Sequence, residues 1–159
     1  MIKLFKSIQT QLFFKSPFYN FLTNNIIDKK IQYNPESLWR GNKLNGKKIV
    51  DGFLDFQKET IHLDNKVWIE NHGSLSWNKF LNSFMWIPDV RAVGTNKARI
   101  FLRKHILNWL NDSDYSKQLI WDLEVLSKRI FYMITNLSFF FETAEESFQK
   151  KFSENINKQ

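Results

Sequence analysis

The sequence predicts a mainly α-helical fold with a small antiparallel β meander near residues 43–70. Two observations support the helices. After Gly73, apolar residues recur at three- and four-residue spacing, which is typical of amphipathic helices. The connections between these helices are short, which favours antiparallel helical hairpins. A third observation supports the meander, because between Trp39 and Glu70 glycines and short β-branched or aromatic runs replace the helical pattern.

The chain length of 159 residues fits a single domain. A domain of this size can bury a substantial core, and the 16 Phe and 6 Trp supply large apolar side chains for it. We divide the chain into N-terminal helices at residues 1–37, the β meander at 38–72 and the helical hairpins at 73–159.

The first residues of the chain are apolar enough to suggest a signal peptide but lack its continuous apolar core. Lys6 and Lys15 interrupt them, so no signal peptide is predicted, and no run of about 18 apolar residues predicts a membrane span. The segment predicts an amphipathic helix that Pro17 ends, with an apolar face that docks on the domain itself or, alternatively, on a membrane or partner. The absence of cysteine excludes disulfide bonds and is compatible with a cytoplasmic location.

The predicted β meander consists of short apolar segments separated by turn residues. Lys58-Glu59 and Asp64-Asn65 are the expected hairpin tips, although neither is the favoured Asn-Gly pair. The expected strands are Lys48–Val50, Phe53–Phe56, Thr60–Leu63 and Val67–Ile69.

Helices follow the meander. Ser76 is the expected N-cap of the first, which runs to Met85 and stops or kinks at Pro88. Thr95 is the expected N-cap of the second, and a loop that contains Asp112 and Asp114 follows it. The last two helices are expected at Lys117–Phe140 and from Ser147 to Gln159.

Charge and motifs restrict the chemistry. The formal net charge of +7 favours anionic partners, although general solubility explains it equally well. His62, His72 and His105 lack the spacing of a zinc site, so we predict no metal and no other cofactor. No G-x-S-x-G motif is present, so no nucleophile is assigned.

Gly41–Lys48, GNKLNGKK, superficially matches a phosphate-binding loop, but Lys48 stands where that motif requires Ser or Thr.

Aromatic residues alternate with Lys and Arg along the chain, a composition typical of proteins that bind single-stranded nucleic acid. No RNA-recognition motif or basic recognition helix accompanies them, so nucleic acid is the weaker alternative partner. Four tryptophans could stack on sugar rings, but tryptophan on a helix more often belongs to the core. They are Trp77, Trp86, Trp109 and Trp121.

The order of residues in Ser74–Arg99 is S-L-S-W-x-x-x-L-N-S-F-M-W-I-P-D-V-R-A-V-G-T-x-x-A-R. It resembles a segment of the heparinase II/III family of polysaccharide lyases, which reads roughly S-x-x-W-x-x-x-L-H-S-F-x-W-L-x-D-L-x-A-x-G. Downstream, Trp109 fits the tryptophan that closes the next helix of that family. Trp121 followed by Arg129 resembles W-x-P-x-x-x-x-x-R-L, and Ser147–Gln159 resembles the helix that ends in S-L-x-x-Q.

The sequence departs from the family at several positions. Asn82 stands where the family has His, Leu123 replaces a Pro, and Tyr132-Met133 replaces Asn-Trp. Family members are also several times larger, with an incomplete (α/α) toroid followed by a C-terminal β-sandwich. The resemblance therefore implies antiparallel helical hairpins that form only the start of the toroid, truncated at the C-terminus, which a separate chain would have to complete.

The resemblance implies β-elimination on acidic, uronate-containing polysaccharide. The family's catalytic residues lie beyond the matched portion, so no position inherits a catalytic role and the chain is expected to be inactive alone. If Arg129 faces a groove it could hold a uronate. The favoured role is structural pairing, for instance with Asp122, Glu124 or an acid of the β region, because a buried arginine needs a carboxylate or carbonyl partner. The candidates for a substrate groove are Asn82, Trp86, Trp121 and Arg129.

Overall fold

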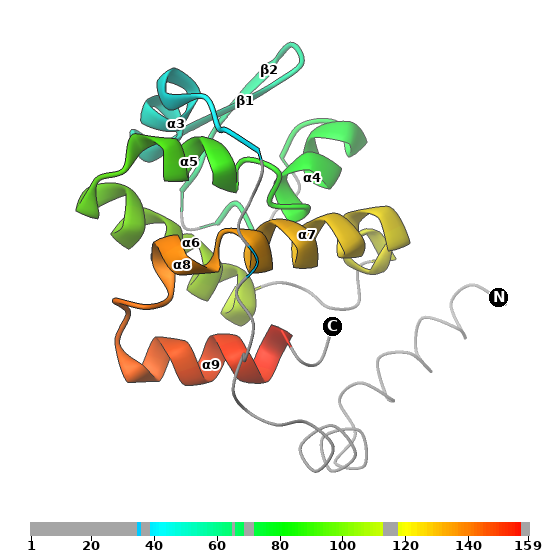
Figure 1. Cartoon of the computed structure of the whole chain (residues 1–159). Helices are drawn as coiled ribbons and strands as arrows, with labels where there is room; N and C mark the ends of the chain where they lie inside the picture. Colours follow the sequence, from blue (N-terminus) through cyan, green and yellow to red (C-terminus); the bar gives the residue numbers. More distant parts are fainter. Residues whose placement is uncertain (1–34, 36–38, 65, 69–71, 113–117, 157–159) are drawn as a thin grey trace, which may run out of the picture.

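A computed structural model describes residues 35, 39–64, 66–68, 72–112 and 118–156. The predicted N-terminal helix and Asp114 lie outside the described residues. Within the described part the chain is mainly helical and has a small antiparallel sheet, as the sequence predicts, but this sheet has two strands and not the four expected (Figure 1). The elements are α3 (Lys43–Val50), β1 (Phe53–Phe56), β2 (Glu59–His62), α4 (Leu75–Asn82), α5 (Ile87–Val93), α6 (Asn96–Asp112), η1 (Gln118–Trp121), α7 (Leu123–Thr135), α8 (Leu137–Phe140) and α9 (Glu146–Ile156).

The strands β1 and β2 form a hairpin and confirm the middle of the predicted meander. They pair antiparallel, with Phe53 opposite His62. The turn is Gln57-Lys58, one residue earlier than the predicted tip at Lys58-Glu59. Gln57 has a φ of 56°, the left-handed conformation that tight two-residue hairpin loops use.

The outer parts of the predicted meander are wrong. Lys48–Val50 is the end of helix α3 and not a strand. Asn42 begins this helix, because its side-chain oxygen accepts hydrogen bonds from two backbone N–H groups of the first turn, at 2.9 and 3.2 Å. Ile49, which suggests a strand in the local sequence, is buried on the inner face of the helix. Val67, expected in the last strand, lies in a turn.

Helix α3 packs so closely on α5 that the two backbones are in contact. A Cβ atom at Gly46 would lie 2.0 Å from the Asp89 carbonyl oxygen, and one at Gly41 would lie 1.9 Å from the Pro88 carbonyl oxygen. The Asp89 carboxylate also accepts a 2.7 Å hydrogen bond from the Asn42 backbone N–H, just before α3 begins. Only glycine fits at these two positions. Gly46 lies inside α3, where glycine costs stability.

The chain turns a corner between α4 and α5. Ser74 caps α4, because its hydroxyl oxygen accepts a hydrogen bond from a first-turn N–H at 3.2 Å, so the predicted cap Ser76 is wrong by two residues. After α4, Phe84 takes a left-handed conformation with a φ of 54°. Pro88 falls in the first turn of α5, where its missing N–H is not needed. It therefore starts α5 and does not end α4.

The later helices agree in part with the prediction. Thr95 caps α6 as predicted, since its hydroxyl oxygen accepts a hydrogen bond from a first-turn N–H at 3.3 Å. Asp112, expected in the following loop, is instead the last residue of this helix. The long helix expected over Lys117–Phe140 is wrong, because Asp122 separates η1 from α7 and Asn136 separates α7 from α8. The last helix, α9, begins at Glu146, one residue before the expected start.

Phe84 lies at the centre of an aromatic core between α4, α5 and α6. Its ring centroid lies 5.4 Å from that of Trp68, 5.3 Å from that of Trp86 and 5.7 Å from that of Trp109. Phe84 is 0% exposed and Trp86 is 1% exposed. Both rings therefore belong to the core, and for Trp86 this confirms the interpretation as a core tryptophan over that of a sugar-stacking one.

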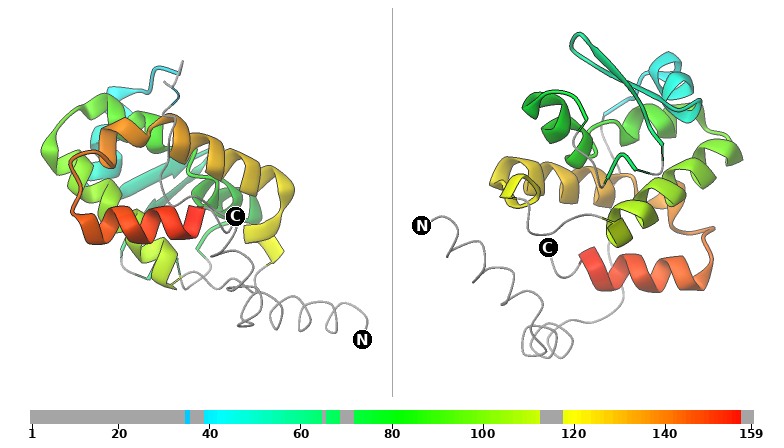
Figure 2. Two further views of the ribbon diagram at one scale, coloured as in Figure 1. Left: turned by 60° about the horizontal axis from the view of Figure 1, so that its bottom comes forward. Right: turned by 180° about the vertical axis from the view of Figure 1, so that it is seen from behind.

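The described elements are arranged in three tiers, which Figures 1 and 2 show from different sides. The hairpin, α3 and α5 lie at one end, α6, α7 and α8 form the middle, and α9 lies at the other end. Arg103 on α6 helps to hold the connection to α9. Its Nε donates to the Phe140 carbonyl at 2.7 Å, and its Nη2 donates to the Thr143 hydroxyl at 2.7 Å.

Candidate functional site

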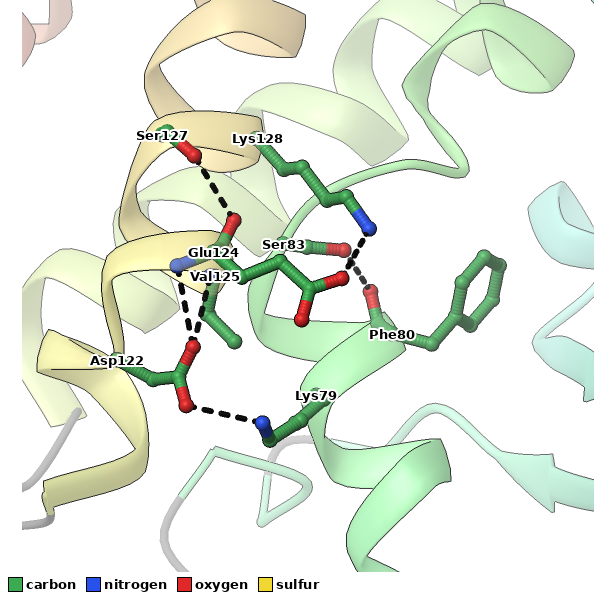
Figure 3. A network of polar contacts seen from close by, with 8 residues as sticks. All are labelled: Lys79, Phe80, Ser83, Asp122, Glu124, Val125, Ser127 and Lys128. Carbon is green, nitrogen blue, oxygen red and sulfur yellow. Dashed lines mark hydrogen bonds and ion pairs between the residues drawn. The ribbon is translucent and has the colours of Figure 1, made fainter.

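A surface pocket of about 260 Å³ lies between the hairpin, α4 and the first turns of α7. Its walls come from segments that are distant in the sequence, so the fold and not a local motif creates it. Figure 3 shows the α4 and α7 sides of this pocket. The hairpin contributes Phe56 and Gln57 to its walls, α4 contributes Lys79 and Phe80, and α7 contributes Glu124 and Lys128.

The apolar wall of the pocket is a stacked pair of phenylalanine rings. The ring centroids of Phe56 and Phe80 lie 4.3 Å apart, and the angle between the ring planes is 11°. The hairpin is also tied to the start of α4. Glu59 accepts a 2.7 Å hydrogen bond from the Ser74 backbone N–H, and its other carboxylate oxygen accepts one from the Ser74 hydroxyl. These links hold the hairpin ring against the helix ring.

The polar side of the pocket carries two lysines, each paired with a carboxylate (Figure 3). Glu124 lines the pocket with them, whereas Asp122 does not. Lys79 Nζ lies 2.9 Å from Asp122 Oδ2, and Lys128 Nζ lies 2.6 Å from Glu124 Oε1. The hydrogen bonds with the lysines lower the pKa of both carboxyl groups, and the hydrogen bond with Asp122 raises the pKa of Lys79. Both carboxylates are therefore charged at neutral pH, and each is paired with one lysine.

Two of the predicted groove residues, Asn82 and Arg129, meet around Trp109. The guanidinium carbon of Arg129 lies 4.6 Å from the centroid of the Trp109 ring. Arg129 Nη1 donates to the backbone oxygens of Ile120 at 3.1 Å and Asn82 at 3.4 Å. Trp109 Nε1 donates to Asn82 Oδ1 at 3.1 Å. Arg129 is 0% exposed, so these contacts support the structural role.

The other two predicted groove residues are tryptophans. Trp86 is buried, and its Nε1 donates to the Leu81 carbonyl at 3.2 Å. Trp121 ends η1 and is half-buried against the core. None of the four predicted groove residues lines the pocket.

The two acids named as alternative partners for Arg129 are Asp122 and Glu124, and they bind Lys79 and Lys128. Sequence reasoning thus missed the residues that line the pocket. One signal was available, because Glu124 and Lys128 are four residues apart on a helix, a spacing that predicts an ion pair. The contact between Phe56 and Phe80 has no such signal, since the two residues belong to different elements.

The chemistry of the pocket suits binding. It offers two aromatic rings and two ammonium groups, and these fit a ligand with an apolar face and an anionic group. Among the described residues, no three His, Cys, Asp or Glu side chains are grouped closely enough to hold a metal ion. In the same part of the chain, no helix has both the length and the apolar character needed to cross a bilayer.

Comparison with known proteins finds no matching family model, curated protein or solved structure. The relationship to the heparinase II/III family therefore stays a prediction from the sequence Ser74–Arg99 and from the downstream residues Trp109, Trp121 and Arg129. What the protein binds must be inferred from the chemistry of the pocket.

Proposed function

We propose that this chain binds acidic, uronate-bearing polysaccharide in the pocket between the hairpin, α4 and α7. The observation that carries the proposal is the stacked Phe56–Phe80 pair, which shares one pocket with the ammonium groups of Lys79 and Lys128. The sequence resemblance to heparinase II/III lyases adds support, and under the proposal the helical hairpins are the start of an incomplete (α/α) toroid.

The two kinds of wall match the two sides of a uronate unit. The C–H face of a sugar ring is apolar and packs on an aromatic ring, while the carboxylate accepts charge-assisted hydrogen bonds from lysine. The pocket volume of about 260 Å³ is close to the lower end for ligand sites, which is about 300 Å³. It therefore accommodates a single sugar unit of a polymer that continues across the surface.

The overall charge of the chain favours the same class of ligand. A formal net charge of +7 attracts a polyanion at long range and raises its association rate. This contribution is screened by salt, whereas the contact with the aromatic pair is not. Binding should therefore weaken with salt but persist at physiological ionic strength.

Calorimetric titration with a hyaluronan oligosaccharide tests the proposal, with the carboxyl-reduced oligosaccharide as the neutral control. The wild-type chain should bind the acidic form more tightly than the reduced form. Phe56→Ala should weaken binding about tenfold, because it removes half of the aromatic wall, whereas Phe53→Ala on the same strand should not. Phe53 is 47% exposed and does not line this pocket, so it is a matched control.

Two results would contradict the proposal. The first is a wild-type chain that binds none of the uronate oligosaccharides. The second is tighter binding of a single-stranded oligonucleotide of equal charge, which would favour a nucleic-acid adaptor. The same samples can be followed for the absorbance of unsaturated uronate, and we expect no turnover because the resemblance stops before the family's catalytic segment.

A further inference from the structure

We propose that Glu124 is a built-in competitor for the anionic ligand: its carboxylate occupies Lys128 and has to leave before a ligand carboxylate can bind there. This inference rests on the proposed function of the pocket. Under this inference Glu124 sets the affinity and specificity for the ligand although it does not contact the bound ligand.

The two ion pairs of the pocket differ in how firmly the carboxylate is held. Asp122 binds Lys79 and also accepts hydrogen bonds from the backbone N–H groups of Glu124 at 3.1 Å and Val125 at 3.4 Å. These two bonds cap α7, so the Asp122 carboxylate cannot move without leaving the start of that helix unsatisfied. The carboxylate that pairs with Lys79 is therefore fixed by the start of α7.

Glu124 is held only weakly by comparison. Its carboxylate pairs with Lys128, four residues later on the same helix, and the Glu124 side chain is 62% exposed. Exposed pairs at this spacing contribute little to stability because water and salt compete with them. A ligand carboxylate can therefore replace Glu124 at a small cost, which makes Lys128 the exchangeable cation.

The direction of the Glu124 side chain places its charge in the path of the ligand. Figure 3 shows it crossing from α7 toward Phe80, in a view where Lys128 and Lys79 lie on either side of its carboxylate. The pKa of Lys79 is raised mainly by its hydrogen bond with Asp122, and the charge of Glu124 adds to this, so Glu124 acts on both ammonium groups. In the free protein each of these ammonium groups is paired with a carboxylate, and an incoming anion meets a like charge.

Replacing Glu124 tests this directly. Glu124→Gln leaves two ammonium groups and one carboxylate, so the pocket gains an uncompensated positive charge without losing side-chain volume. We expect a hyaluronan tetrasaccharide to bind the variant about fivefold more tightly, which corresponds to the upper end for an exposed ion pair. Glu124→Ala should repeat the gain, and the reduced neutral tetrasaccharide should bind all forms alike.

Glu146→Gln is the matched control, because it changes the net charge of the chain by the same amount on α9, away from the pocket. Its affinity should stay at the wild-type value. If the wild-type chain binds and Glu124→Gln binds no more tightly than Glu146→Gln, the competitor role is overturned while the binding function stands. Weaker binding by Glu124→Gln would also overturn it, since Glu124 would then contact the ligand. If neither the wild type nor Glu124→Gln binds, the proposed function itself fails.

Discussion

The guanidinium carbon of Arg129 lies 4.6 Å from the centroid of the Trp109 ring, and both side chains are fully buried. Trp109 donates its indole N–H to Asn82, so this contact joins α4, α6 and α7 at one point. A buried cation is tolerated only when its partners compensate the loss of hydration. The ring and the carbonyl oxygens of Ile120 and Asn82 contribute to that compensation.

Arg129→Ala should therefore destabilise the fold by about 3 kcal/mol, because it removes a desolvated cation–π contact and hydrogen bonds to buried carbonyls. Urea unfolding measures the change, and Arg40→Ala, at an exposed position, serves as the control with an expected loss below about 0.5 kcal/mol. An Arg129→Ala variant with wild-type stability but no oligosaccharide binding would instead assign Arg129 to the ligand.

Gly46→Ala should prevent the close contact between α3 and α5. The added methyl group would lie 2.0 Å from the Asp89 carbonyl oxygen, so the helices must separate at a cost of about 3 kcal/mol, the upper range for overpacking. Gly94→Ala is the comparison, because nothing lies within 4 Å of a Cβ atom there and only the left-handed φ of 74° is strained. Its expected cost is about 1 kcal/mol. Equal losses in thermal stability would show that backbone conformation, and not contact, decides both positions.

Ser74→Ala should destabilise the protein by about 1 kcal/mol, because it removes the N-cap of α4. Ser76→Ala, two residues later and exposed, should have almost no effect. Glu59 binds the same serine, so a double-mutant cycle of Ser74→Ala with Glu59→Ala should give a coupling energy of at least about 0.5 kcal/mol. Strict additivity would mean that the hairpin and α4 are not linked through this contact.

The stability of the fold should fall as the pH drops from about 6.5 to about 4. Burial, and to a smaller extent the charge of Lys104, lowers the pKa of His105 from its ordinary 6.5 to about 4. The unfolded chain therefore binds a proton in this window that the folded chain excludes, and stability is complete only above pH 6.5. The expected slope approaches about 1.4 kcal/mol per pH unit.

His105→Leu removes that titration, and its free energy of unfolding should change less with pH over the same window. The carboxylates whose pKa is lowered in the fold, Asp55, Asp122 and Glu124, affect both proteins at the acidic end and cancel in the comparison. Parallel pH curves for the wild type and His105→Leu would contradict the assignment.

Elements with a local signal could be predicted from the sequence. Thr95 and the apolar periodicity that follows it in the sequence predicted α6, and the start of α9 was predicted to within one residue. The short apolar segments on either side of the turn located the hairpin, although the predicted tip, Lys58-Glu59, was one residue too late. In each case the local residues specify the element and place its boundary to within one residue, because caps and turns act over a few positions.

Elements that depend on distant residues could not be predicted in the same way. Lys48–Val50 is helical because Asn42 caps the segment and Asp89, far along the chain, binds the backbone just before it. The pocket could not be predicted for a similar reason, since Phe56 and Phe80 stack only after the hairpin folds back on α4. Arg129 was singled out from the sequence, but its partner ring, Trp109, could be identified only from the structure.

The left-handed backbone of Phe84 ties the formation of the α4–α5 corner to the rest of the molecule. A phenylalanine at a φ of 54° is strained by itself, and the strain is offset only when its ring is enclosed by Trp68, Trp86 and Trp109. A peptide that contains α4 and α5 alone lacks two of these rings, so the corner should not persist in it. The helices on either side then order together with α6 in a single cooperative step, and not one after another along the chain.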